Sequence, residues 1–115
     1  MENIYCIEIA FSHNRIGDAT LPESRIALAE QQALTLFANC FGGGQRYHSM
    51  GSYRAALNEV AVGQCSVIRA YALEVKEHWD RLHTLAREIA SLLEQECVLL
   101  SSVALDGSLL FVEPE

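Results

Sequence analysis

Lysine is almost absent from this 115-residue chain: Lys76 stands beside seven arginines, and the formal net charge is −7. A chain so poor in cations binds a phosphate backbone weakly, so we expect no nucleic-acid polymer as a partner. No apolar run approaches the roughly 20 residues of a membrane helix, and the N-terminus lacks the basic and apolar segments of a signal peptide. We therefore expect a cytoplasmic protein with no membrane partner.

The sequence also lacks motifs that indicate metal binding or a particular catalytic reaction. The four cysteines (Cys6, Cys40, Cys65 and Cys97) form no C-x-x-C pair and no zinc-knuckle spacing, so we expect them to be reduced and structural, with no metal ion and no cofactor. The patterns G-x-S-x-G, Walker loop and H-E-x-x-H do not occur either. The sequence therefore assigns no catalytic residue, and we lean toward a protein that is not an enzyme.

What is present is the composition of a folded domain. Half the residues are apolar and a fifth are charged, and the length suits one core, so we expect a single domain over residues 1–115. The order of hydrophobic periods predicts strand, helix, strand, strand, helix, strand.

The first half of the chain gives a strand and a helix. Tyr5, Ile7, Ile9 and Phe11 alternate with other residues, which predicts a strand with this face toward the core. Residues 20–23, Thr-Leu-Pro-Glu, match a capping box, and the helix should run from there to about residue 40. Glycines at 42–44 should end it. Its buried stripe should be Ile26, Ala29, Ala33, Leu36, Phe37 and Cys40.

The second half repeats the pattern with three strands and a helix. We expect strands over residues 45–54, 65–74 and 98–105, with residues 55–64 as a crossing loop. A helix over residues 76–96 should bury Trp79, Leu82, Ala86, Ile89 and Leu93. Asp106-Gly107 is typical of a type I′ turn and predicts a hairpin with residues 108–112.

This order predicts an α+β fold, a ferredoxin-like βαββαβ two-layer sandwich with a C-terminal β-hairpin. Both helices should cover one face of an antiparallel sheet, with the first and third strands at its centre. The other face should then lie open, with Ile4, Cys6 and Tyr71 among its side chains. Open apolar faces are usually interfaces, so we expect a symmetric homo-oligomer, most simply a homodimer.

Three short stretches resemble signatures of small, mostly uncharacterised bacterial βαββαβ proteins. They are Phe41-Gly42-Gly43, Gly51-Ser52-Tyr53-Arg54 and Gln95-Glu96-Cys97-Val98. The resemblance covers roughly the second half of the chain and implies the ferredoxin-like fold. Those families have no agreed activity, so the resemblance implies no catalytic residue.

A set of arginines and tyrosines in the second and third strand regions is the candidate ligand site. Guanidinium groups clamp phosphate or carboxylate, and tyrosine rings stack on a base. Glu8 and Arg69 either satisfy each other across the sheet or mark a polar pocket, and His48 is either a ligand or proton-transfer group or a structural one. The candidate ligand-binding residues are Glu8, Arg46, Tyr47, His48, Tyr53, Arg54, Arg69 and Tyr71.

Three functions compete on this basis. The first is a non-enzymatic homo-oligomeric module that binds a small anionic ligand, such as a nucleotide, and acts as a sensor or a phage-type sponge. The second is a protein-interaction or inhibitor module with an acidic surface. The third is a small enzyme on a dimeric ferredoxin-like scaffold, with Glu8 or His48 as general base.

Overall fold

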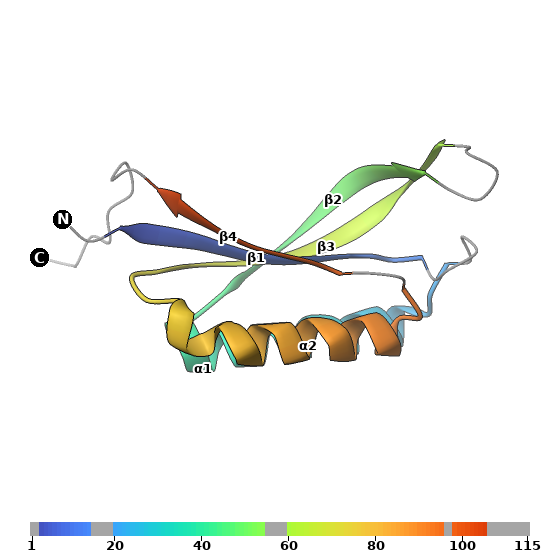
Figure 1. Cartoon of the computed structure of the whole chain (residues 1–115). Helices are drawn as coiled ribbons and strands as arrows, with labels where there is room; N and C mark the ends of the chain where they lie inside the picture. Colours follow the sequence, from blue (N-terminus) through green and yellow to red (C-terminus); the bar gives the residue numbers. More distant parts are fainter. Residues whose placement is uncertain (1–2, 15–19, 55–59, 96–97, 106–115) are drawn as a thin grey trace, which may run out of the picture.

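The computed structural model describes residues 3–14, 20–54, 60–95 and 98–105 (Figure 1). A single 3₁₀ turn, η2 (Lys76–His78), leads into the second helix. In chain order the main elements are β1 (Ile4–Ser12), α1 (Glu23–Phe41), β2 (Gln45–Arg54), β3 (Val60–Ala72), α2 (Trp79–Leu92) and β4 (Leu99–Leu105).

The four strands form one antiparallel sheet in the order β2-β3-β1-β4. Both helices pack on one face of it, and no helix covers the other face in Figure 1. This confirms the predicted α+β sandwich with the first and third strands at the centre. The predicted C-terminal hairpin, residues 106–112, lies outside the described residues.

The core lies between the sheet and the helices. Ile7, Ile9 and Phe11 of β1 are buried as the alternation predicted, and they face Phe37 of α1 and Ile89 of α2 in one cluster. Burial of apolar surface contributes about 25 cal/mol per Å², so this layer is the main force that holds the helices to the sheet.

The start of α1 differs from the predicted capping box. The N-cap residue is Pro22, and no side chain caps the helix. Thr20 instead forms a bridge with Asn14, and the N–H of Leu21 donates to the carbonyl of His13. The backbone at 20–21 therefore ties the start of α1 to the end of β1. At the other end, Gly42 adopts φ 82° and donates its N–H to the carbonyl of Ala38, as expected of a glycine cap.

The hairpin of β2 and β3 is longer than predicted. Strand β3 begins at Val60, within the segment expected to be a loop, and Val60 pairs with Arg54. The last pair between β1 and β3 joins Ser12 to Cys65, so the tip of the hairpin extends past the end of β1 (Figure 1). The pairing of β2 with β3 continues through the pair Gly51–Gly63 without a break.

The second helix is shorter than predicted, from Trp79 to Leu92, and Glu94 takes a positive φ of 52° just after it. Trp79, at the first position of α2, is only partly buried and packs edge-on against the ring of His83. Full burial of Trp79 was therefore a wrong prediction, whereas Ile89 and Leu93 are buried as expected.

Among the described residues, neither helix combines the length and the apolar character needed to cross a bilayer. The cytoplasmic location and the single-domain organisation of the chain stay predictions.

Candidate functional site

A buried carboxylate lies between α1 and the sheet. The side chain of Glu30 is 6% exposed, and its Oε2 atom accepts a 2.8 Å hydrogen bond from the hydroxyl of Ser66. His48 Nε2 lies 2.8 Å from the same oxygen, and Arg46 Nη1 lies 3.4 Å from Oε1. A buried anion is costly unless it is paired and hydrogen-bonded, and these three contacts meet that requirement.

A second imidazole extends this arrangement. His13 Nε2 lies 2.7 Å from Ser66 Oγ. Ser66 has one hydroxyl hydrogen, which it donates to Glu30, so His13 donates to Ser66. The result is a continuous chain of hydrogen bonds from His13 through Ser66 and Glu30 to His48. We call these four residues the Glu30 cluster.

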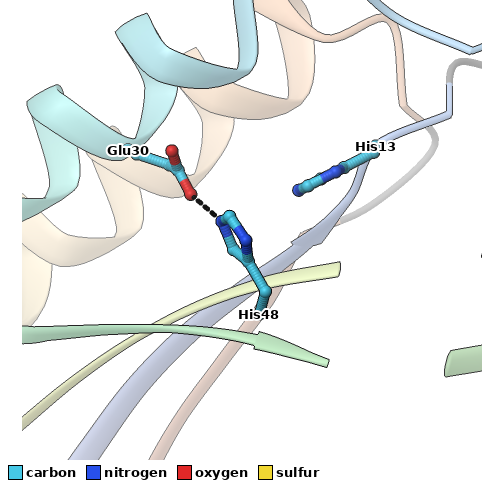
Figure 2. Close-up of side chains that lie close together, drawn as sticks. All are labelled: His13, Glu30 and His48. Carbon is cyan, nitrogen blue, oxygen red and sulfur yellow. Dashed lines mark hydrogen bonds and ion pairs between the residues drawn. The ribbon is translucent and has the colours of Figure 1, made fainter. Parts of the chain in front are cut away.

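The local sequence explains why these side chains meet. Glu30 follows Ile26 by four residues and precedes Ala33 by three, so it shares the inward face of α1. His48 and Ser66 are paired across β2 and β3, and directly paired residues point to the same face of a sheet. Figure 2 shows Glu30 on α1 and the two imidazoles turned toward it, His48 from β2 and His13 from the end of β1.

The environment holds Glu30 as an anion. Burial by itself raises the pKa of the Glu30 carboxyl, because it disfavours the charged form. Hydrogen bonds from His48 and Ser66, with the charge of Arg46, act in the opposite direction and prevail, so the pKa of Glu30 lies below its ordinary value. The carboxylate is therefore an acceptor, not an acid, at neutral pH.

The environment holds His13 neutral. Burial lowers the pKa of the His13 imidazole, and the neighbouring His48 lowers it further. Glu30 and a hydrogen bond with Gln64 act in the opposite direction but do not offset the burial. His13 is therefore an uncharged imidazole near pH 7.

A cavity opens beside the cluster, with a volume of about 590 Å³. Its described lining includes the carboxylates of Glu23 and Glu30, and none of its described lining residues is an arginine or a lysine. Arg46 lines a second, smaller hollow, which shares Ala27 and Glu30 with the cavity. The described lining residues are His13, Asn14, Thr20, Leu21, Glu23, Ile26, Ala27, Glu30, His48, Met50, Gly63 and Gln64.

The structure does not bring the predicted ligand residues together. Arg46 and His48 lie on the helix-covered side of β2, against Glu30. Arg69, in contrast, donates from Nε and Nη2 to Oε2 of Glu8, at 3.1 and 2.9 Å, because these residues are directly paired on β1 and β3. Arg46 and Arg69 therefore lie on opposite faces of the sheet and do not converge, because Arg69 pairs with Gln45, the neighbour of Arg46, and successive residues of a strand point to opposite faces.

The open face of the sheet carries its own polar group. The guanidinium of Arg69 lies over the ring of Tyr47, 5.0 Å from its centre, and Tyr71 lies beside Arg69 on β3. The interpretation in which Glu8 and Arg69 satisfy each other across the sheet is confirmed. Tyr53 and Arg54 belong to β2, and their side chains lie outside the described part of the chain.

The described thiols are structural. Cys6, Cys40 and Cys65 are free, and Cys97 lies outside the described residues. Burial raises the pKa of the Cys65 thiol, and burial together with the charge of Glu8 raises the pKa of Cys6. Both thiols are therefore protonated and weakly nucleophilic at neutral pH.

Three members of the Glu30 cluster were missed by the sequence patterns: His13, Glu30 and Ser66. Glu30 left a signal, because the helical spacing that buries Ile26 and Ala33 also turns residue 30 inward. A charged residue on the buried face of a helix needs hydrogen-bond partners. His48, already in the candidate ligand set, is one of them. His13 left a weaker signal: it continues the two-residue alternation of Ile9 and Phe11, but it lies just beyond the end of β1 at Ser12.

No protein-family model matches the sequence, and no curated protein matches it. Solved structures do match. A phage SAM lyase in complex with S-methyl-5′-thioadenosine has a TM-score of 0.68 and 14% identity, over 90% of this chain and 83% of that one. The same kind of lyase in its apo state has a TM-score of 0.67 and 13% identity, over 89% and 81%.

A third match is the divalent ion tolerance protein CutA1 from Ehrlichia chaffeensis, with a TM-score of 0.56 and 7% identity, over 94% of this chain and 86% of that one. At these identities the likeness is one of fold. It confirms the arrangement of two helices on a four-stranded sheet.

The neutral state of His13 predicts a loss of stability in mild acid. The pKa of His13 in the fold lies below its ordinary value of 6.5, so the unfolded chain binds this proton first as the pH falls. The contribution of neutral His13 to the free energy of unfolding is complete above pH 6.5. It is lost as the pH falls from there toward the lower pKa of His13 in the folded state. Urea unfolding in metal-free buffer should show this decline in the wild type.

His13→Gln should remove that part of the decline, because glutamine does not titrate. His83→Gln, on the exposed surface of α2, is the matched control and should retain it. Equal slopes of unfolding free energy against pH in the wild type and His13→Gln would contradict the assignment.

Proposed function

We propose that this protein binds a small nucleoside-type molecule, neutral or positively charged, in the cavity beside the Glu30 cluster. The observation that carries the proposal is a cavity of about 590 Å³ that ends on a buried, hydrogen-bonded carboxylate. Ligand sites commonly have volumes of about 300–1,000 Å³ and combine an apolar wall with a few placed polar groups.

The lining suits the two parts of a nucleoside. Leu21, Ile26 and Met50 offer apolar surface to a base. The Glu30 carboxylate and the imidazole of His48 line the cavity and offer hydrogen-bonding groups to ribose hydroxyls or to an exocyclic amine. The ligand of the phage SAM lyase, S-methyl-5′-thioadenosine, is a nucleoside of this kind and provides a probe.

The charge of the described lining favours a neutral or cationic ligand over a phosphorylated one. The described lining carries two carboxylates, Glu23 and Glu30, and none of the guanidinium groups expected to clamp an anion. Arg46 and Arg69, which were expected to do so, are paired with Glu30 and Glu8. We therefore replace the expected anionic ligand with one that is neutral or cationic.

Closing the mouth of the cavity should abolish binding. Ala27 is exposed and lines the cavity from α1, so Ala27→Phe fills it without loss of core packing. In calorimetric titrations in the presence of EDTA, the wild type should bind S-methyl-5′-thioadenosine and adenosine, and AMP at least about tenfold more weakly, because its phosphate faces the carboxylates. Ala27→Phe should bind none of them.

Ala38→Phe is the matched control, because Ala38 is exposed on α1 three turns away and lines neither cavity. It should bind as the wild type does. Tighter binding of AMP than of adenosine would contradict the charge argument. If no nucleoside binds, that result favours the alternative function, a protein-interaction module.

We propose further that the chain forms a homo-oligomer through the open face of the sheet. On this face β1 and β4 place Cys6 opposite Val103 and Ala10 opposite Leu99, and Val103 and Leu99 are 56% and 62% exposed. The polar group at its centre, Glu8 with Arg69, is already paired, so it can be covered without leaving a lone charge.

A charge on this face should weaken the oligomer. We expect Val103→Lys to shift the species seen by sedimentation equilibrium toward monomer, because a lysine inside an apolar interface must be desolvated. Leu28→Lys, on the solvent side of α1, is the control and should leave the mass unchanged. A wild type that is monomeric at high micromolar concentration would refute the proposal.

A second candidate function is cleavage of S-adenosylmethionine, which the hydrogen-bonded chain of a carboxylate and two imidazoles at the cavity favours. The carboxylates Glu23 and Glu30 would attract the positive sulfonium. In a balanced step, a carboxylate oxygen of the substrate itself attacks the γ-carbon of its amino-acid chain as the bond from that carbon to sulfur breaks. The electron pair stays on sulfur, so S-methyl-5′-thioadenosine leaves as a neutral thioether and the amino-acid part closes to a lactone.

Chromatography of S-adenosylmethionine incubated with the protein tests this candidate. A lyase should release S-methyl-5′-thioadenosine at a rate proportional to protein concentration, and Glu30→Gln should lower that rate at least about tenfold. Folding of Glu30→Gln is checked by circular dichroism, and His83→Gln serves as the active control. Binding of the nucleoside without release of product would favour the binding module.

A further inference from the structure

The Glu30 cluster also presents three metal-ligating groups to one point. Donor atoms of His13, Glu30 and His48 all lie within 4.8 Å of one another. We infer that these three residues bind one divalent transition-metal ion, with Zn²⁺ as the first choice, at the base of the cavity. This inference does not depend on nucleoside binding, since the metal would bind to the side chains alone.

The donor set has the right chemistry for such an ion. Two imidazoles and one carboxylate are a recurring ligand set of catalytic zinc sites, and the same set binds Fe²⁺ in oxygenases. Hard ions such as Mg²⁺ and Ca²⁺ prefer all-oxygen ligands, so two imidazoles select against them. The three residues come from the end of β1, from α1 and from β2, so the fold, not a local motif, assembles the set.

The present spacing of the three donor atoms is close to that of a site with a metal ion bound. Ligand atoms about 2.1 Å from a tetrahedral zinc ion lie about 3.4 Å apart. His48 Nε2 and Glu30 Oε2 are now 2.8 Å apart and share a proton, and no pair of the three donor atoms exceeds 4.8 Å. A metal ion would take the place of that hydrogen between the two atoms, and small side-chain rotations would bring the three donors to bonding distance.

The surrounding groups suit outer-shell roles. Ser66 is fully buried and donates to Glu30, so it would orient the carboxylate. Arg46 approaches the other carboxylate oxygen, Oε1, and leaves Oε2 for the ion. His13, Glu30 and His48, the side chains drawn in Figure 2, also line the cavity, so the fourth coordination position would face it and be reached by water or by a ligand.

The site can be tested on the full chain without any organic ligand. Protein stripped with EDTA and dialysed into chelator-free buffer is titrated with ZnCl₂ by calorimetry, and with CoCl₂ by visible absorption. We expect one ion per chain. The Co²⁺ spectrum should show the strong d–d bands of four- or five-coordination and no thiolate charge-transfer band, because the three ligands are nitrogen and oxygen.

Variants locate the site. His48 is 48% exposed, so His48→Gln should fold normally yet weaken Zn²⁺ binding by more than about 100-fold, the upper range for loss of a mere outer-shell partner. His13→Gln should have a similar effect. His83→Gln removes an exposed histidine of α2 outside the cluster and should bind Zn²⁺ as the wild type does.

Three results would overturn the inference: no Zn²⁺ binding by folded wild-type protein, wild-type affinity in both His13→Gln and His48→Gln, or a thiolate band in the Co²⁺ spectrum. Because nucleoside binding is measured in EDTA and Zn²⁺ binding without nucleoside, either can fail while the other stands.

Discussion

The arrangement of this molecule around its cavity depends on the burial of one carboxylate, that of Glu30. An unpaired anion in the core would cost several kcal/mol, so its position under α1 requires donors from the sheet. Ser66 of β3 and His48 of β2 supply them, and Ser66 in turn accepts from His13 beyond β1. One charged group thereby joins α1 directly to β2 and β3, and through Ser66 to the residue that follows β1, on the same side as the cavity.

The two-residue period of the strands divides the polar residues between two surfaces. On β2, Tyr47 points to the open face while Arg46 and His48 point to the helices. The open face holds a paired ion, Glu8 with Arg69, among apolar residues, which suits coverage by another surface. The helix side holds the cavity and the titratable groups. The proposed interface and the proposed ligand site therefore lie on opposite sides of one sheet.

Much of this fold was predictable, because alternation and helical spacing are direct records of burial. The faces of β1, the bounds of β2 and the glycine end of α1 follow from the residues alone. The start of β3 could not be predicted, because the length of a hairpin depends on how its two strands pair and not on either strand alone. For the same reason the pairing of His48 with Ser66 could not be foreseen, nor the approach of His13 to them. Glu30 could have been recognised from its place on the helix.

The order of strand pairing has a kinetic consequence. Hairpin β2–β3 is local, but β1 pairs with β4 across nearly the whole described chain, as Ile4 with Leu105. Non-local pairings form slowly, because the chain must lose the conformational entropy of a large loop before these contacts form. The β2–β3 hairpin can thus place His48 beside Ser66 early, while His13 arrives only when β1 enters the sheet between β3 and β4. The complete cluster is therefore a late product of folding, and any molecule that binds it would stabilise the finished fold over its partly folded precursors.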